Sequence, residues 1–192
     1  LIGDDLSNDI QGGGGDDEIR ALSSDGDGGA DILRTGGGNS VVDGGEGPDI
    51  ISYNVIPWAV TVDLVAGITT TDGFGTDTLI DIEHVTGSKE NDTIIGNDHD
   101  NVIIGNGGSD TMDGGGGVDE AAFLDAREAV TVDLGAGTAD AGEWGFDTFV
   151  NFENVERLVR LAGVPRPVAG VAPLAVLELP DQGASTGEVF TS

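Results

Sequence analysis

The sequence contains no cysteine, which excludes disulfides, thiolate zinc sites, iron–sulfur clusters and cysteine nucleophiles. Basic residues are scarce: 7 Lys and Arg stand against 36 Asp and Glu, and the formal net charge is −29. Because phosphate groups bind to basic surfaces, this balance argues against nucleic acid and anionic membranes as partners. No apolar run is long enough to cross a bilayer as a helix, so no transmembrane segment is expected.

Glycine and acidic residues are abundant instead, with 34 Gly in 192 residues. Together with only 5% aromatic residues, this is the composition of a flexible and self-repelling chain. Yet 38% of the residues are apolar. These apolar side chains can be buried together only if the carboxylates are neutralised, and a divalent cation that prefers oxygen ligands would do so.

Glycine, acidic and apolar residues recur with a period of nine. In each unit positions 1 to 4 are glycine-rich, position 6 is Asp in eight units, Asn in two and Ser in one, and position 8 is apolar. The eleven units span residues 3–11, 12–20, 26–34, 35–43, 44–52, 72–80, 87–95, 96–104, 105–113, 114–122 and 142–150. A flexible acidic linker would not keep three residue types in separate phases, so the pattern indicates a repeat architecture.

A longer duplication lies on top of the nonapeptides. When the sequence is laid over itself with Ala59 on Ala129, residues 59–85 align with residues 129–155 without a gap, and 13 of the 27 pairs are identical. Each block therefore holds a run of nonapeptides and one spacer. Internal repeats at a fixed period predict a solenoid, in which no single repeat can bury its apolar face alone.

Nine residues of this pattern can form one glycine-rich turn and one three-residue strand. We therefore expect an all-β coil with two short strands per 18-residue turn, in which strands n and n+2 stack in parallel and position 8 fills the interior. The position-6 side chains then form one column on each edge of the coil. Carboxylates aligned in this way repel one another unless a cation lies between consecutive loops, and Ca²⁺ suits carboxylate and carbonyl ligands.

The pattern G-G-x-G-x-D-x-(apolar)-x resembles the RTX (repeats-in-toxin), or hemolysin-type, calcium-binding repeat. The spacers at 60–85 and 130–155 are also similar to spacers found among such repeats. The resemblance covers about residues 1 to 157 and implies a parallel β-roll that binds several Ca²⁺ ions. It further implies a monomeric bacterial protein that the type I secretion machinery exports, and so a secreted, extracellular or cell-surface location.

The same resemblance implies the ligands. Loops two half-turns apart share a site, so Asp31 should pair with Asp49, Asp92 with Asp110, and Asn101 with Asp119. Residues 81–86 would form a shortened half-turn, so that Asp77 shares an edge with Asp92. Asp17 and Asp147 are further expected ligands for which the spacing assigns no partner. Loop carbonyls complete each shell, and those expected to contribute belong to Gly29, Gly44, Gly75, Gly87, Gly105, Gly107, Gly114 and Gly116.

After residue 157 the composition changes: residues 158–192 hold four of the six Pro and no nonapeptide. This tail is a candidate cap for the last coil, a remnant of a secretion signal, or a disordered segment. Because the chain begins in mid-repeat, we expect a larger parent protein. Residues 1–157 are then either a calcium-dependent folding and export module, or a calcium-stiffened structural or adhesive array of a cell-surface protein.

Enzyme chemistry within this chain is not expected. Neither His84 nor His99 has a second His four residues on, as an HExxH zinc site requires. Residues 183–187 match G-x-S-x-G, but that motif needs a large α/β sheet around it. A protease, lipase or other hydrolase activity would therefore belong to the parent protein.

Overall fold

The computed structural model describes residues 1–4, 6–21, 28–71, 73, 75–124 and 130–156. The strands are β1 (Asp9–Gln11), β2 (Glu18–Arg20), β3 (Ile32–Arg34), β4 (Val41–Asp43), β5 (Ile50–Ser52), β6 (Val60–Asp63), β7 (Ile68–Thr71), β8 (Gly75–Ile80), β9 (His84–Thr86), β10 (Thr93–Ile95), β11 (Val102–Ile104), β12 (Thr111–Asp113), β13 (Glu120–Ala122), β14 (Thr131–Asp133), β15 (Thr138–Asp140), β16 (Phe146–Val150) and β17 (Asn154–Glu156). Each nonapeptide ends in a strand that includes positions 7 to 9, as predicted. One 3-10 turn, η1 (Gly142–Trp144), is the only helical element of the described ranges, and none of them forms a helix long and apolar enough to span a bilayer.

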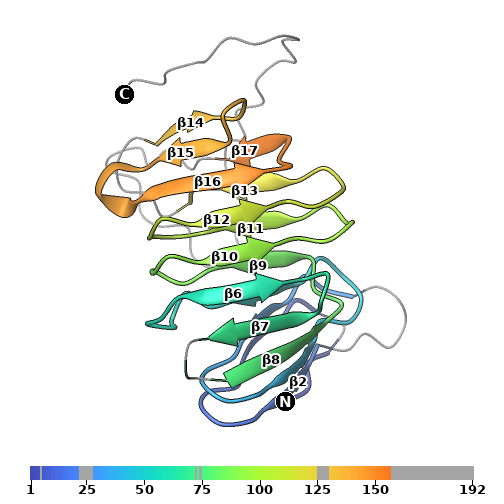
Figure 1. Ribbon diagram of the computed structural model, residues 1–192. Coiled ribbons are helices and arrows are strands. Elements are labelled where there is room, and N and C mark those ends of the chain that lie inside the picture. Colours follow the sequence, from blue (N-terminus) through green and yellow to red (C-terminus); the bar gives the residue numbers. More distant parts are fainter. Residues whose placement is uncertain (5, 22–27, 72, 74, 125–129, 157–192) are drawn as a thin grey trace, which may run out of the picture.

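Successive strands of the nonapeptide runs enter opposite sheets, so the chain winds into a coil whose turns stack on one another (Figure 1). One sheet has seven strands in the order β1-β3-β5-β9-β11-β13-β17, and the other has ten in the order β14-β15-β16-β12-β10-β6-β7-β8-β4-β2. Strands two nonapeptides apart pair in parallel: β10 lies beside β12 with Ile94 opposite Met112, and β11 beside β13 with Ile103 opposite Ala121. This arrangement is the predicted parallel β-roll.

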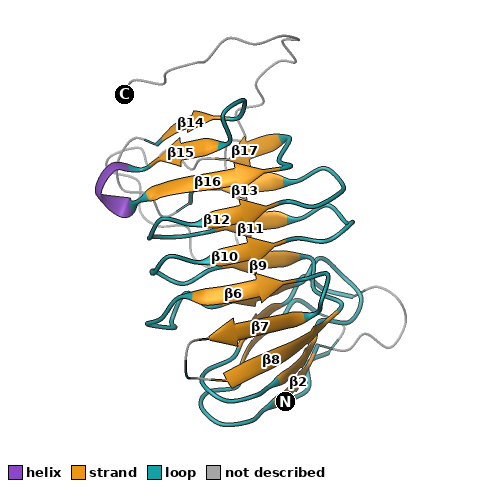
Figure 2. Ribbon diagram, viewed as in Figure 1, coloured by secondary structure: helices purple, strands orange, loops and turns teal. Residues whose placement is uncertain are grey.

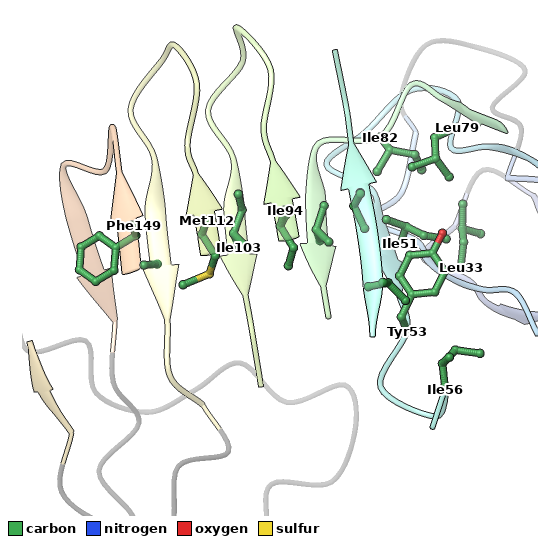
Figure 3. Packing of buried hydrophobic residues seen from close by; sticks show 14 of the residues in the cluster. Leu33, Ile51, Tyr53, Ile56, Leu79, Ile82, Ile94, Ile103, Met112 and Phe149 are labelled. Atoms are coloured by element: carbon green, nitrogen blue, oxygen red, sulfur yellow. The ribbon is translucent and has the colours of Figure 1, made fainter. Parts of the chain in front are cut away.

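The core lies between the two sheets and contains a row of position-8 side chains, to which the spacers and half-turns add further buried residues such as Tyr53, Ile56 and Ile82 (Figure 3). Ten of the eleven position-8 side chains are buried, and Ile10 is half-buried because β1 is the edge strand of its sheet. Burial of one such Ile or Leu side chain contributes about 1.5–3 kcal/mol. In most of these strands the central residue is the buried one, as in β11, where Ile103 is fully buried and both of its neighbours are half-buried, whereas β5 and β13 also bury their last residue.

The two spacers add antiparallel hairpins to the parallel roll, a feature that the sequence did not indicate (Figure 2). In the first spacer, Asp63 Oδ1 accepts the Ala66 N–H at 2.8 Å and Gly67 has φ +66°, which closes a tight turn between β6 and β7. Asp133 and Gly137 repeat the same turn between β14 and β15. Strand β6 then pairs in parallel with β10, so the first hairpin joins the two blocks into one sheet.

The insertion at residues 21–25 changes the spacing of the first turns without changing their geometry. Ile10 lies opposite Leu33, and Ile19 lies opposite Val42. Both offsets exceed two nonapeptides by the length of the inserted segment. The first two nonapeptides are therefore in phase with the rest of the roll. The predicted tail, residues 158–192, lies outside the described residues.

Candidate metal centre

The glycine-rich turns adopt backbone conformations that L-residues with a side chain rarely take. Position 4 has a positive φ in seven units, at Gly15, Gly38, Gly47, Gly75, Gly108, Gly117 and Gly145. Position 2 also has a positive φ in several units, for example 86° at Gly45 and 91° at Gly115. Residues with a positive φ thus alternate with residues of negative φ along these turns, and the peptide groups change direction at each residue with a positive φ.

The position-6 residues form a ladder along each edge of the coil. The backbone N–H of position 6 in one turn donates a hydrogen bond to the position-6 side chain of the next turn. These bonds join Asp31 to Asp49 (2.9 Å), Asp92 to Asp110 (2.8 Å) and Asn101 to Asp119 (2.8 Å). The structure thus brings together the three pairs that the family resemblance implies, while their ligation of a cation stays a prediction.

Two residues without an assigned partner find one in the structure. The Asp17 N–H donates to Ser40 Oγ at 3.3 Å, and the Asp110 N–H donates to Asp147 Oδ1 at 2.8 Å. The second bond joins residues far apart in sequence, because the spacer hairpin intervenes between the two strands. Asp147 therefore continues the column that contains Asp92 and Asp110.

Residues 81–86 form a shortened half-turn that ends in β9, as predicted. Asp77 lies on β8, and Asp92 directly precedes β10. Both strands belong to the ten-stranded sheet, so the two residues share an edge of the coil. They are not neighbours, however, because β6 and β7 lie between β8 and β10. Asp77 Oδ1 instead accepts the N–H of Ser40, at 2.9 Å.

Four carboxylate oxygens in these columns are buried and have no hydrogen-bond partner. They are Oδ2 of Asp17, Asp49, Asp110 and Asp119. In Asp49, Asp110 and Asp119 the other oxygen, Oδ1, accepts the N–H of the preceding turn. A buried carboxylate oxygen without a partner costs free energy unless a cation binds it.

The pKa values of the carboxylates in these columns also favour a bound cation. Burial raises the pKa of Asp110 to about 8 and that of Asp49 to about 7, and the neighbouring carboxylates add to both shifts. Burial also raises the pKa of Asp147 to about 6, and it raises the pKa of Asp31 and of Asp119. The protein alone therefore disfavours the charged form of these groups, and a bound cation would reverse that preference.

Two of the predicted ligands are satisfied within the protein. Asp92 Oδ2 accepts the Ser88 N–H at 2.6 Å and its Oδ1 accepts the Ser88 hydroxyl at 2.8 Å. Asp77 Oδ2 accepts the hydroxyls of Thr35 (2.8 Å) and Tyr53 (3.3 Å). Both carboxylates are buried, but neither has an oxygen without a partner, in contrast to Asp110.

Asn101 is also satisfied, by a different arrangement. Its Oδ1 accepts the Asn97 N–H at 2.8 Å, and its amide Nδ2 donates to the Glu83 carbonyl at 2.7 Å. Asn8 repeats the pattern, with Oδ1 accepting the Asp4 N–H and Nδ2 donating to Asp4 Oδ1. In these two loops the side-chain amide of Asn donates hydrogen bonds to oxygens of its own loop or of the neighbouring loop. These oxygens therefore have a partner without a cation.

The predicted glycine ligands fall into two groups. Gly44, Gly87, Gly105 and Gly114, at position 1, lie against the position-6 carboxylate of their own loop. A methyl group at Gly44 would come within 2.8 Å of Asp49 Oδ2, and one at Gly114 within 2.7 Å of Asp119 Oδ2. The other four face the neighbouring turn, where Gly29 and Gly75 meet backbone, Gly107 meets the Trp144 ring and Gly116 meets the Asp98 side chain.

The sequence template missed two residues that complete a column. Glu83 Oε2 accepts the Asp49 N–H at 2.9 Å, and Glu153 Oε2 accepts the Asp119 N–H at 2.9 Å. Each glutamate takes the place that a position-6 Asp takes elsewhere. The available signal was the duplication itself, because Glu83 and Glu153 are one of its identical pairs.

The donor set fits Ca²⁺. Within the described ranges no group of three or more His, Asp or Glu side chains is close enough to hold a metal ion, so backbone carbonyls must supply part of any shell. Ca²⁺ accepts six to eight oxygen ligands in flexible geometry, and carboxylates with backbone carbonyls are its usual donors. The unpartnered oxygens of Asp17, Asp49, Asp110 and Asp119 are the side-chain atoms that would hold such ions.

Comparison with known protein families agrees with this geometry. The model of the RTX calcium-binding nonapeptide repeat matches the chain in four copies, over residues 2–25, 25–54 and 86–121. The matched segments cover nine of the eleven nonapeptides, the ninth without its last residue, and leave out nearly all of both spacers. No curated protein matches the chain.

Proposed function

Because the chain is a member of the RTX calcium-binding nonapeptide repeat family, we propose that it is the calcium-binding module of a larger secreted bacterial protein. The module folds on binding Ca²⁺ after a type I secretion system has exported the chain. It has no catalytic role of its own, and any hydrolase activity belongs to the parent protein.

The observation that carries this proposal is the set of unpartnered carboxylate oxygens. Asp49, Asp110 and Asp119 are each 1% exposed or less, and each has one oxygen bonded to a backbone N–H and one without a partner. An uncompensated buried charge costs several kcal/mol. Calcium ions bound at these oxygens convert that cost into binding energy, and binding energy at a site absent from the unfolded chain is folding energy.

Export explains why such coupling is useful. Sites with affinities on the order of 10⁻⁴ to 10⁻³ M, as in extracellular calcium modules, are empty in a cytosol and filled outside the cell. The chain then crosses a narrow exporter unfolded and folds where calcium is abundant. Folding of the roll outside the cell also opposes backward movement of the chain through the exporter.

Calorimetric titration of the chain with CaCl₂ tests the proposal. We expect several ions to bind, with midpoints between roughly 0.1 and 1 mM, and MgCl₂ to compete poorly because it demands a smaller octahedral site. The circular dichroism signal should change over the same range of calcium concentration. A chain that binds no calcium even well above this range contradicts the proposed function.

A second candidate is a calcium-stiffened array that holds a binding domain away from a cell surface. The pairing of β6 with β10 favours it, because it makes both blocks one continuous sheet that can transmit force. The sequence of the parent protein separates the two candidates. A protease or lipase domain beside the roll supports the export module, and tandem adhesive domains support the array.

A further inference from the structure

The nonapeptide template ends before each shortened half-turn, yet the position-6 column continues through it. In the first block the chain passes from β8 to β9 through Asp81, Ile82 and Glu83 alone. Asp81 has φ +48°, and its equivalent Asn151 has φ +58°, a conformation that Asp and Asn tolerate better than other residues with a side chain. The same three-residue loop therefore occurs twice in the chain.

Each shortened loop lies directly over a glycine-rich loop with an unpartnered carboxylate. The Asp81 carbonyl and Asp49 Oδ2 both lie against Gly44, and the Asn151 carbonyl and Asp119 Oδ2 both lie against Gly114. The backbone N–H of Glu83 donates to the Asp49 carbonyl at 3.2 Å, which holds the two loops together. The unpartnered oxygen of one loop and the carbonyl of the other thus lie beside the same glycine.

Glutamate suits this place because the loop is short. A regular unit has five residues before its Asp, whereas the shortened loop has two before its Glu. The longer side chain still reaches the N–H of Asp49 with Oε2.

We propose that Glu83 with Asp49, and Glu153 with Asp119, form two calcium sites that close the column of each block, with both glutamates outside the segments that match the repeat model. The inference rests on the proposed function. The ligands are the unpartnered Oδ2 of the aspartate, a carboxylate oxygen of the glutamate, and the carbonyl of Asp81 or Asn151. These sites bind the spacer to the repeats, and they make the folding of each spacer depend on calcium.

The two sites differ in exposure. Glu83 is half-buried and Asn101 of the next turn donates to its carbonyl, whereas Glu153 belongs to the last described turn and is exposed. Screening and competition by water weaken an exposed site. The site at Glu83 should therefore bind calcium more tightly than the site at Glu153.

The test uses the full chain with Glu83→Gln, Glu153→Gln and both changes together. Gln keeps an oxygen that accepts the N–H of the aspartate, so the fold is retained while the charged ligand is lost. Glu18→Gln is the matched control, because Glu18 lies on the outer face of β2 and its side chain is 64% exposed. Calcium binding is measured by titration calorimetry, and folding by circular dichroism in excess CaCl₂.

We expect each single change to remove one calcium ion at saturation or to weaken one site about tenfold or more, since ligand charge sets the affinity of such sites. The double change should remove two. Asp49→Asn combined with Glu83→Gln should lose no more than either change alone, because both act on one site. This non-additivity remains measurable at Asp119 and Glu153 if the Glu83 variant does not fold.

Two outcomes must be kept apart. If the unaltered chain binds no calcium, the proposed function fails and the two sites fail with it. If the unaltered chain binds several ions, but the Glu83 and Glu153 variants bind as many ions with the same affinities as the Glu18 variant, only the two closing sites are refuted.

Discussion

At the scale of single residues, the side chain at position 6 decides how its turn is satisfied. An Asp can keep one carboxylate oxygen without a hydrogen-bond partner and so offer it to a cation, as at Asp110. Asn closes the turn with its own amide, as at Asn101. Asp with a hydroxyl neighbour is closed by that hydroxyl, as at Asp92 with Ser88. The same template therefore produces turns that leave a buried carboxylate oxygen without a partner and turns that do not.

Replacing Asp110 with Ala should lower calcium affinity and stability together, because the carboxylate orders two loops and presents an unpartnered oxygen. The change also leaves the N–H of Asp92 without its acceptor, and a buried donor left unsatisfied costs about 1–3 kcal/mol. Asp140→Ala is the control, since Asp140 is exposed and its side chain bonds the nearby Gly142 N–H. Calorimetry that finds both variants alike would show that the register of the sites is wrong.

The raised carboxylate pKa values predict how the calcium-free chain responds to pH. Folded Asp49 and Asp110 hold protons from their ordinary pKa of 3.8 up to about 7 and 8, so the folded state binds more protons than the unfolded state in this window. Stability without calcium should therefore fall as pH rises from about 4 to 8. In EDTA, far-ultraviolet circular dichroism should show more β structure at pH 5 than at pH 8.

Calcium should reverse this trend, because protons compete with the ion for the same oxygens. In excess CaCl₂ the β signal should be larger at pH 8 than at pH 5. The combined variant with Asp49→Asn and Asp110→Asn is the control, and its signal in EDTA should depend less on pH. An unaltered chain whose β signal in EDTA increased with pH would contradict the buried carboxylates described here.

Sequence reasoning reached the ligand columns because their period is strict. The resemblance implies that loops two nonapeptides apart pair, and the strict period then identifies the pairs, such as Asp31 with Asp49. Asp147 could not be paired by counting, because a hairpin of variable length separates it from Asp110. Glu83 was missed because the nonapeptide template places the acidic residue sixth in its unit, whereas Glu83 is the third residue of a shortened loop.

At the scale of secondary-structure elements, the strands were predictable and the hairpins were not. A three-residue strand with one apolar side chain is specified by each unit, and ten of eleven position-8 side chains are buried. The spacers carry alternating Val and Thr that a strand of either direction would accept. What makes them antiparallel is the turn at Gly67, which a sequence with many glycines does not single out.

Replacing Ile51 with Ala should lower the free energy of unfolding in excess CaCl₂ by about 2–5 kcal/mol, because the side chain is fully buried in the narrow core. Its neighbour Ile50 is half-buried, so Ile50→Ala should cost less. Urea denaturation midpoints measure both. Equal losses at the two positions would contradict the strand alternation.

Replacing Gly67 with Ala tests the hairpin that joins the blocks. Gly67 has φ +66°, and a methyl group there would lie 2.8 Å from the Leu79 carbonyl. Gly73 has φ +82° with no atom within 4 Å of the same point, so Gly73→Ala carries the backbone strain of about 1–3 kcal/mol without the contact.

Thermal unfolding in excess CaCl₂ should therefore show a larger loss for Gly67→Ala than for Gly73→Ala. Gly137→Ala should behave like Gly67→Ala, because Gly137 has φ +66° and lies against the Phe149 carbonyl in the second block. If Gly73→Ala were the more destabilising change, the packing of the hairpin on β8 would not be as described.

At the scale of the whole molecule, charge opposes the fold. Residues 1–157 contain 33 acids and five bases, a net charge of −28, around a narrow core between two sheets of short strands. We expect that burial of this core alone offsets neither that repulsion nor the backbone entropy of so many glycines. Under the proposed function, calcium supplies the missing stabilisation, so the length of the folded roll should follow the number of sites filled.

The most direct test of this account measures the same chain with and without calcium. In EDTA at pH 8 we expect little β signal in circular dichroism and an expanded radius in small-angle X-ray scattering. Addition of millimolar CaCl₂ should produce the β signal and the compact rod together in one cooperative transition, and MgCl₂ should be far less effective. A chain that kept its full β signal and compact radius in EDTA at pH 8 would contradict the coupling of folding to calcium.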